Sequence, residues 1–517
     1  NKHKTSISLQ DLSPDQSKAF DQIKDELLKK NIVLFQGVTS SGKTAIYMKL
    51  IKEITDNGGQ VLFLLPEISI TSQMVSRFNN YFAGIVQVYH SKFNLNERTE
   101  IWKSVSQAKH NARVIIGARS SLFLPFKKLD LIVVDEEHET SYKQFDPAPR
   151  YHARDAAVYL SNILNLKVIL GSATPSLESI INVKKKKYGM VYLNQRYGGV
   201  KLPDINVIDL KESHKRKLMK GDFSQDLINS ISNTLRDGKQ IILFQNRRGY
   251  APILECLTCG HMPSCIQCDV SLTYHINSGK LQCHYCGYNI PIPKVCNSCS
   301  ATNLTTKGSG TQQIEKQLEG LFPNIPIGRM DWDTTRGKND FDRIIDLFSL
   351  QKIKILVGTQ MIIKGLDFKN VNLVGVLNAD HLINFPDFRS YERSFQMLTQ
   401  VAGRSGRSAD QGKVVIQSYQ PYHRHHCPCI HYHCYQSHHL RWCPDLHHLP
   451  QLHQICHHYH YRYLRNHLFH RHPYPLLQIC YKRRRHIRNS LLFYRHDLCL
   501  GHTRDWRSPM ISRQVWL

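Results

Sequence analysis

Eight cysteines lie between residues 256 and 299 and form four Cys-x-x-Cys pairs. Each pair can place two thiolates on one metal ion through a tight turn, and eight thiolates make two tetrahedral four-sulfur sites, the closed form typical of structural zinc. Iron–sulfur ligation and disulfides are the alternatives, and the regular spacing and an intracellular setting favour zinc over both. The sequence therefore predicts two bound Zn²⁺ ions.

The order of the pairs predicts which of them share an ion. The inner pairs enclose a hairpin-length stretch that contains Leu272, Tyr274 and Leu281, and nested sites gather four thiolates each without crossing the chain. A module this small has few apolar residues of its own, so metal binding would supply its folding energy. The two predicted ligand sets are Cys256, Cys259, Cys296 and Cys299, and Cys265, Cys268, Cys283 and Cys286.

Residues 37–44, Gly-Val-Thr-Ser-Ser-Gly-Lys-Thr, match the phosphate-binding pattern G-x-x-x-x-G-K-[ST]. An apolar strand candidate precedes them and a helical stretch follows, which is the context that the pattern requires. Backbone N–H groups between Gly37 and Gly42 would cradle phosphates at the helix start. Lys43 would pair with the β- and γ-phosphates, and Thr44 would hold Mg²⁺. A chance Gly/Ser-rich turn is the alternative, against which the flanking strand and helix argue.

A second polar motif follows the apolar run at residues 131–134, which ends in Asp-Glu-Glu-His. Asp135 at the strand tip suits contact with Mg²⁺, and Glu136 suits positioning or deprotonating the attacking water. An acid-ended strand alone is commonly a solvated edge. Because a P-loop lies upstream, the pair of motifs predicts ATP hydrolysis with Mg²⁺.

The elements that must position these residues alternate between apolar strand candidates and helical stretches, as in α/β proteins with parallel sheets. Ligands of open α/β sheets bind beyond the carboxyl ends of strands, and most polar motifs begin where a strand candidate ends. Two series of strands predict two lobes, with a boundary near residues 196–222. The first series comprises residues 32–35, 61–65, 114–116, 131–134 and 168–170, and the second comprises 241–244, 353–357, 373–377 and 414–416.

These series divide the chain into four parts. The first lobe, residues 1–200, is expected to bind ATP. The second lobe is expected to span residues 201–253 and 303–420, and the Cys-rich insertion, 254–302, interrupts it. Residues 421–517 are set apart because they hold 19 of the 29 His and 7 of the 15 Cys without a sustained helical or strand period.

The last part of the chain is unusual in composition. It has 14 Lys and Arg against 3 Asp and Glu, one Gly and no Glu. A His/Cys metal-binding tail and a basic nucleic-acid arm are two interpretations. A third, an out-of-frame translation, is the one we favour.

The net charge indicates the kind of partner. The formal charge of the chain is +27, and residues 1–420 alone keep +16, which favours an acidic partner, most simply nucleic acid. No apolar run is long enough to cross a membrane, and no signal peptide is visible, although the chain starts with Asn1 and not with Met. We therefore expect no membrane association and a cytoplasmic location.

The motifs together resemble helicase superfamily 2, in which Asp-Glu-x-His follows a P-loop. Residues 171–174, Gly-Ser-Ala-Thr, resemble the coupling motif of that superfamily, and residues 400–407, Gln-Val-Ala-Gly-Arg-Ser-Gly-Arg, resemble its arginine-finger motif. The resemblance implies two RecA-like lobes. It also implies that Arg404 and Arg407 meet the γ-phosphate as charge develops there, the alternative being two arginines on a helix surface.

The segments between these motifs are similar to the PriA family of bacterial replication-restart helicases, in order from residue 10 to residue 420. Two positions depart from the family pattern, with Ala45 after the P-loop threonine and Leu366 where the family often has His. The similar segments are residues 66–71, 118–125, 141–144, 149–155, 171–179, 246–252, 358–365 and 387–393.

The resemblance assigns further roles. Gln16 resembles the glutamine that binds adenine upstream of the P-loop, although a lone Gln near a helix start is commonly only solvated. Residues 141–144 and 149–155 resemble the two parts of an aromatic-rich loop, and Tyr142, Phe145 and Tyr151 of this loop would either stack on DNA bases or pack under the lobes.

The PriA resemblance implies an ATP-dependent 3′-to-5′ DNA helicase that acts in the restart of stalled forks and in primosome assembly. Its implied partners are single-stranded and forked DNA, primosome proteins and single-stranded-DNA-binding protein, with the zinc module aiding unwinding and partner binding. The N-terminal DNA-binding domains of the family are expected to be absent. The alternative function is a catalytically impaired fragment that serves only as a DNA- and primosome-binding scaffold.

Overall fold

The computed structural model describes residues 11–421 of the chain. Within this range it leaves out short segments at 67–71, 91–92, 246–252, 269, 276–278, 306–309, 332, 336, 338–339, 363–367 and 407–410. All described residues belong to the first of the two units into which the chain divides, Asn1–Gln436. Five of the segments singled out above fall wholly or partly on residues outside this description, namely 66–71, 246–252, 358–365, 400–407 and the tail from 422 onward.

The first lobe contains a seven-stranded sheet in which every paired strand is parallel to its neighbour. The strand order is β3-β4-β2-β5-β6-β1-β7. The strands are β1 (Ile32–Gly37), β2 (Gln60–Leu64), β3 (Val86–Tyr89), β4 (Val114–Gly117), β5 (Leu129–Asp135), β6 (Lys167–Ser172) and β7 (Gly189–Leu193). The helices are α1 (Pro14–Lys29), α2 (Lys43–Asp56), α3 (Ser72–Tyr81), α4 (Leu95–Ser106), α5 (Ala153–Leu164) and α6 (Leu177–Lys184).

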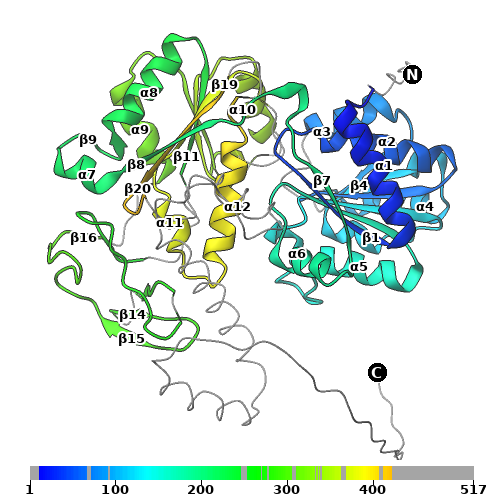
Figure 1. Ribbon diagram of the computed structural model, residues 1–517, viewed down its shortest axis with the longest axis horizontal. Coiled ribbons are helices and arrows are strands. Elements are labelled where there is room, and N and C mark those ends of the chain that lie inside the picture. Colours follow the sequence, from blue (N-terminus) through cyan, green and yellow to red (C-terminus); the bar gives the residue numbers. More distant parts are fainter. Residues whose placement is uncertain are drawn as a thin grey trace, which may run out of the picture. The chain divides into compact units, whose positions relative to one another are not determined.

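Apolar residues fill both faces of this sheet. On one face Phe20 of α1 and Ile46 of α2 pack with strand residues such as Val33. On the other face Ile101 of α4 and Ala157 of α5 pack with the alternate strand residues. Figure 1 shows α1 and α2 on one side of the strands and α5 and α6 on the other. Such two-sided burial explains why the central strands are near-continuous apolar runs.

The first helix is specified by local sequence. Ser13 is its N-cap, Pro14 opens it, and the side chains of Ser13 and Gln16 bond each other's backbone N–H groups in a capping box. Ala19 and Ile23 lie on the same face four residues apart and are buried. The cap therefore fixes the position of Gln16 next to the P-loop.

The second lobe contains a six-stranded parallel sheet of order β17-β18-β11-β19-β20-β8. The strands are β8 (Asp204–Asp209), β11 (Gln240–Phe244), β17 (Ile327–Met330), β18 (Ile355–Gly358), β19 (Val371–Val376) and β20 (Lys413–Ser418). The helices are α7 (Leu210–Lys215), α8 (Gln225–Arg236), α9 (Thr311–Leu321), α10 (Asp340–Ser349), α11 (Asp380–Ile383) and α12 (Ser390–Ala402), and a short antiparallel pair joins β9 (Met219–Lys220) to β10 (Phe223–Ser224).

All nine predicted strands are present, and the two parallel α/β lobes of a RecA-like arrangement are confirmed. The prediction missed the strands at the sheet edges, β3, β7, β8 and β17. These edge strands are only partly buried, so they alternate apolar and polar residues or carry few apolar ones. One of them, β8, lies inside the stretch 196–222 that was expected to be only a boundary.

The Cys-rich insertion in the second lobe is also confirmed, since it leaves the chain after β11 and returns before α9. It contains the pair β12 (Glu255–Cys256) with β16 (Leu304–Thr305), and a three-stranded antiparallel sheet of β13 (Thr273–His275), β14 (Lys280–Gln282) and β15 (Asn289–Pro291). Its core is small, with Leu272 and Leu281 fully buried at the centre. Among the described helices, none is both long and apolar enough to cross a bilayer.

Candidate nucleotide site and zinc centre

The P-loop joins β1 to α2 and has the backbone that a phosphate cradle needs. Gly42 is the N-cap of α2 with φ 84°, in the left-handed region that favours glycine, and a Cβ there would lie 2.2 Å from Gln16 Nε2. A Cβ on Gly37 would lie 2.8 Å from Ser41 Oγ. Lys43 Nζ donates to Gly37 O over 2.9 Å, so the lysine already folds back over the loop. This arrangement fits the phosphates of ATP at the start of α2.

Gln16 is buried against the P-loop and both ends of its amide are engaged. Its Oε1 accepts a hydrogen bond from Ser13 N at 3.0 Å, and its Nε2 donates to Ser41 O at 3.1 Å. These bonds tie the start of α1 to the loop that would hold phosphates. Gln16 is therefore more than a solvated helix residue, and its contact with adenine stays a prediction.

Asp135 ends β5 and is nearly buried. Its Oδ1 accepts a hydrogen bond from Tyr47 Oη at 3.3 Å, and its main-chain O accepts one from Tyr142 Oη at 2.7 Å. Burial and then the Glu136 charge raise the pKa of Asp135, the Lys43 charge opposes both, and the net result is a pKa of about 7. A bound cation would stabilise the charged form of this buried carboxylate. The chemistry of Asp135 therefore fits a Mg²⁺ ligand.

Glu136 lies at the point where three motifs meet. Its φ is 52°, a left-handed conformation that is uncommon for a residue with a side chain. Gln400 Nε2 of the second lobe donates to Glu136 Oε2 at 3.2 Å and lies 2.9 Å from His138 Nε2. His138 Nδ1 in turn lies 2.7 Å from Ser172 Oγ of the Gly-Ser-Ala-Thr motif. Motifs 262–264 residues apart in the chain thus form one hydrogen-bonded group.

The predicted arginine fingers are only partly placed. α12 ends at Ala402, and a Cβ on Gly403 would lie 2.4 Å from Thr39 Oγ1, so this segment lies against the P-loop. Arg404 follows directly and is half-buried, whereas Arg407 lies outside the described residues. The roles of both arginines stay predictions.

The three aromatic residues of the predicted loop have different surroundings. Tyr142 is 1% exposed, and its hydroxyl donates to Leu64 O and Asp135 O, so it packs inside the lobe and is not exposed for base stacking. Tyr151 is half-buried with its ring edge-on to Phe123, the centroids 4.9 Å apart. Phe145 is 68% exposed and is the residue of the three that is open to a base.

Glu137 and Arg154 form a buried ion pair that is not among the predicted site residues. Arg154 Nη1 lies 3.0 Å from Glu137 Oε2, and Glu137 also accepts from Ser176 N at 2.6 Å and from Ser179 Oγ at 2.9 Å. Burial opposes the charge on Arg154, but the charges of Glu137 and Asp155 outweigh it and raise the pKa. One sequence feature could have indicated this pair, because Glu137 is a third acid that directly follows Asp135 and Glu136 at the end of a buried strand.

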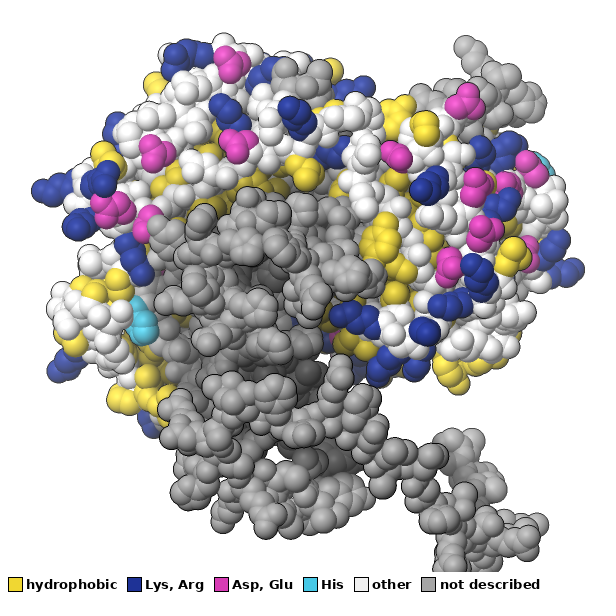
Figure 2. Space-filling view, in the orientation of Figure 1, with side chains coloured by type: hydrophobic (Ala, Val, Ile, Leu, Met, Phe, Trp, Pro, Cys, Tyr) yellow, Lys and Arg dark blue, Asp and Glu magenta, His cyan; other side chains and the backbone are white. Residues whose placement is uncertain are grey.

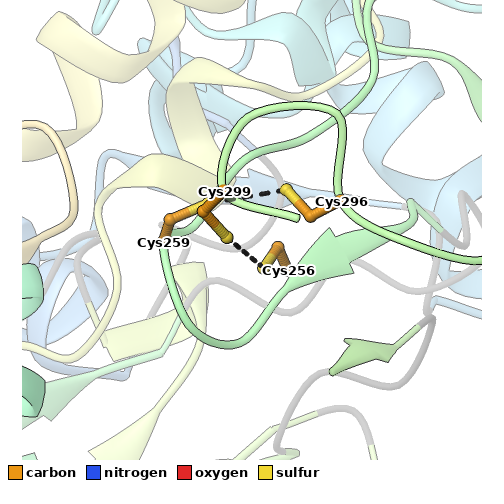
Figure 3. A group of neighbouring side chains, drawn as sticks. All are labelled: Cys256, Cys259, Cys296 and Cys299. Carbon is orange, nitrogen blue, oxygen red and sulfur yellow. Dashed lines mark hydrogen bonds between the residues drawn. The ribbon is translucent and has the colours of Figure 1, made fainter. Parts of the chain in front are cut away.

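The eight cysteines come together as two groups of four. The sulfurs of Cys256, Cys259, Cys296 and Cys299 lie within 4.8 Å of one another, as do those of Cys265, Cys268, Cys283 and Cys286. Sγ–Sγ distances are 3.6 Å for Cys256–Cys299 and Cys259–Cys296 in the group of Figure 3. Four sulfurs at about 2.3 Å from one Zn²⁺ would be about 3.8 Å apart. The two groups are therefore the zinc-binding kind, and their membership matches the predicted nesting.

One backbone turn recurs in all four pairs. In each, the N–H of the first cysteine donates to the carbonyl five residues later, at His261, Val270, Tyr288 or Ala301. The residue before that carbonyl has positive φ in three of the turns, at Gly260, Gly287 and Ser300. Backbone N–H groups also donate to the sulfurs of Cys265, Cys283 and Cys296 at 3.4 Å. Such bonds stabilise the thiolate form that metals require.

The module contacts the second lobe through polar and aromatic residues. His381 Nε2 lies 2.8 Å from Glu255 Oε2, next to the first cysteine. A Cβ on Gly260 would lie 2.3 Å from the ring of Tyr419, so the outer turn sits directly on the end of β20. Tyr285, in an inner turn, accepts a hydrogen bond on its hydroxyl from Phe388 N at 3.4 Å.

Comparison with known families first gives the class of protein. Residues 13–183 match the DEAD/DEAH box helicase family and residues 296–409 match the helicase conserved C-terminal domain. Between them, residues 265–291 match the PriA DNA helicase Cys-rich region domain. The chain therefore contains a two-lobed helicase core with a zinc-binding insertion.

The curated relatives give the family. The replication restart protein PriA of Bacillus subtilis is 42% identical over 414 residues, 80% of this chain and 51% of the relative. PriA of Haemophilus influenzae is 43% identical over 393 residues, 76% of this chain and 53% of the relative. This chain belongs to the PriA family, and it spans about half the length of the relatives it matches.

Proposed function

We propose that this chain is the motor of an ATP-dependent 3′-to-5′ DNA helicase that acts in the restart of stalled replication forks and in primosome assembly in the bacterial cytoplasm. The convergence of motifs at Glu136 carries the proposal, because Gln400 joins the second lobe to the hydrolytic group of the first. A site shared by two lobes can close around ATP and open after hydrolysis, and such cycles move a motor along a strand.

The residues around the P-loop would divide the work of hydrolysis. Backbone N–H groups and Lys43 would hold the phosphates, the lysine exchanging its bond to Gly37 O for one to phosphate. The Thr44 hydroxyl and the Asp135 carboxylate would hold Mg²⁺, which neutralises charge on the phosphoryl group when bound. Glu136 would orient the attacking water and accept its proton.

Residues of the second lobe would make hydrolysis depend on lobe closure. Gln400 bonds Glu136 and lies within bonding distance of His138, so movement of α12 changes the surroundings of the hydrolytic carboxylate. Arg404 and Arg407 would meet the charge that develops on the γ-phosphate. Turnover would therefore be fast only when the two lobes are closed.

Several exposed residues support single-stranded and forked DNA as the substrate. Phe145 is open to stack on a base, and a run of four exposed lysines, residues 184–187, begins at the last residue of α6. Figure 2 shows Lys and Arg side chains gathered on the first lobe near the place that Figure 1 gives to α6. Basic side chains at this density suit phosphate contacts that weaken as salt rises.

We assign the eight cysteines as the ligands of two structural Zn²⁺ ions. The zinc module would support strand separation and contact with primosome proteins and single-stranded-DNA-binding protein, because it presents exposed residues such as Ile266 away from its small core. A passive scaffold with an inactive site is the second candidate. The hydrogen bond that Gln400 donates to Glu136 across the two lobes favours the enzyme over the scaffold.

The test is ATP hydrolysis by the full chain with and without single-stranded DNA, followed by strand displacement on duplexes with a 3′ or a 5′ single-stranded tail. We expect single-stranded DNA to stimulate hydrolysis. We also expect strand displacement to require the 3′ tail, because a motor that moves 3′-to-5′ along this tail reaches the duplex. Tight DNA binding without stimulated hydrolysis would favour the scaffold instead. Displacement from the opposite tail would contradict the proposed direction.

A further inference from the structure

A buried tyrosine hydroxyl lies directly behind the predicted magnesium ligand. Tyr47 is on α2, three residues after Thr44, and is fully buried. Its ring packs edge-on between Phe35 and Phe63, with centroids 5.9 and 5.7 Å away. A hydroxyl in such an apolar cluster costs free energy unless it is bonded. Its partner is Asp135 Oδ1, at 3.3 Å.

Space for this hydroxyl depends on a glycine in the neighbouring strand. Gly171 of β6 is paired with Asp135 of β5 in the sheet register. A Cβ on Gly171 would lie 1.8 Å from Tyr47 Oη and 3.1 Å from Asp135 Oδ1, so any larger residue would displace the hydroxyl. Three elements that carry separate motifs thus meet at one hydrogen bond.

Tyr47 donates this hydrogen bond from its hydroxyl, and the Asp135 carboxylate accepts it. The bond therefore acts on the carboxylate itself and not on the main chain of Asp135.

We propose that Tyr47 is a positioning residue for Mg²⁺, because its hydroxyl fixes the orientation of the Asp135 carboxylate. This inference rests on the nucleotide site proposed above. The terminal torsion of aspartate is broad, so a carboxylate without such a bond would rotate. Partners that orient a metal-binding carboxylate typically contribute 10- to 100-fold in metal affinity.

Tyr142 provides a matched control. It is as buried as Tyr47, and its hydroxyl bonds the same residue, but it donates to the main-chain O of Asp135 at 2.7 Å and to Leu64 O at 3.0 Å. Tyr142→Phe removes one buried oxygen from the same lobe without touching the carboxylate. Any effect of simple packing or stability should therefore appear in both variants.

The experiment measures binding of Mn²⁺, as a spin-active substitute for Mg²⁺, to the full chain with a non-hydrolysable ATP analogue. Free Mn²⁺ is counted by electron paramagnetic resonance. We expect the Kd for Mn²⁺ to rise about 10-fold in Tyr47→Phe and less than about 2-fold in Tyr142→Phe. Binding of the analogue without metal should be the same in both variants.

Gly171→Ala is a second route to the same result, because its Cβ would displace the hydroxyl while Tyr47 itself is unchanged. It should weaken Mn²⁺ binding at least as much as Tyr47→Phe. Unchanged Mn²⁺ affinity in Tyr47→Phe, or equal losses in the two tyrosine variants, would overturn the inference. Wild-type protein that binds Mn²⁺ with the analogue but never hydrolyses ATP would refute the proposed motor and leave this inference standing.

Discussion

The helicase lobes and the zinc module are held together by different forces. Each lobe has a parallel sheet whose two faces are covered by clusters of buried Val, Ile, Leu and Phe. The module has one cluster with six buried members, and two of them, Cys265 and Cys283, are predicted metal ligands. Apolar burial therefore stabilises the lobes, whereas the module depends on its metal. A core mutation should therefore destabilise the lobes, whereas loss of metal should destabilise the module.

The largest expected effect is the loss of a zinc ligand. Cys265→Ser should unfold the inner hairpin, because a structural Zn²⁺ contributes on the order of 10 kcal/mol to the folding of a small module. Metal analysis of the variant should show about one Zn²⁺ fewer per chain than the wild type. Metal bound by the His- and Cys-rich tail would be the same in both proteins, so the difference in zinc content reports on the module.

The same variant tests whether the two regions act separately. ATP hydrolysis should survive in Cys265→Ser better than duplex unwinding, because the P-loop and Asp135 lie in the first lobe. Ser298→Ala, in an outer turn between two cysteines, is a control that leaves every thiolate in place. Equal loss of hydrolysis and unwinding would contradict the separation and would mean that the module supports the whole second lobe.

The next effect concerns chemistry in the lobes. Glu136→Gln should keep ATP binding and zinc content but slow hydrolysis about 10²- to 10⁴-fold, because the amide cannot accept a proton from water. Steady-state hydrolysis and equilibrium binding of a fluorescent nucleotide measure the two properties. Lys43→Ala is the contrasting variant, since it should weaken nucleotide binding as well. Wild-type turnover in Glu136→Gln would remove this residue from the mechanism.

A substitution in the apolar core of a lobe should have a smaller effect on stability, and this effect should not depend on bound metal. Phe348 is fully buried in the second lobe, where its ring packs edge-on against Phe368 with centroids 4.7 Å apart. Phe348→Ala should lower the free energy of unfolding by about 3–5 kcal/mol, measured by denaturant titration. Leu350→Ala, two residues away and 66% exposed, should change it by less than about 0.5 kcal/mol.

The sequence was most informative where chemistry needs a fixed spacing. The turn of each Cys-x-x-Cys pair and the Gly42-Lys43-Thr44 end of the P-loop are local, so their residues could be assigned from neighbours in the chain. The strands at the centres of the sheets were predicted for a related reason, because burial on both faces leaves an unbroken apolar run. Edge strands lack this signal, and β8 lies in the stretch where the sequence predicts a boundary between the lobes.

Contacts between distant residues could not be predicted from the sequence. No sequence pattern distinguishes Tyr47 from other buried residues of α2, and only its closeness to Asp135 and Gly171 gives its hydroxyl a role. For Tyr142 the sequence leaves base stacking and packing open, and its bonds to two strand ends place it in the core. Sequence periodicity indicates that a residue is buried but not which polar atom it meets.

The smallest predicted effect concerns the contact between the module and the second lobe. His381 and Glu255 are 2.8 Å apart, with side chains 22% and 10% exposed. Burial alone would lower the pKa of His381, but the charge of Glu255 and the hydrogen bond between them outweigh burial and raise it. A histidine with a raised pKa in the folded state binds its proton more tightly there than in the unfolded chain.

The stability from this pair should therefore be fully present below the unfolded-state pKa of about 6.5 and be lost as pH rises through the higher folded-state pKa. His381→Gln should remove about 1 kcal/mol at pH 6 and progressively less at alkaline pH, measured as the difference in thermal unfolding from wild type. Because thiolate protonation weakens zinc binding in both proteins, the difference in stability between them reports on the histidine alone.

Glu255→Gln should remove the same pH dependence, and exposed His110→Gln should not. If His381→Gln kept the wild-type pH dependence, the module would be held to the lobe by apolar packing such as that of Tyr419 on Gly260, and the difference between the two regions would be smaller than their cores indicate.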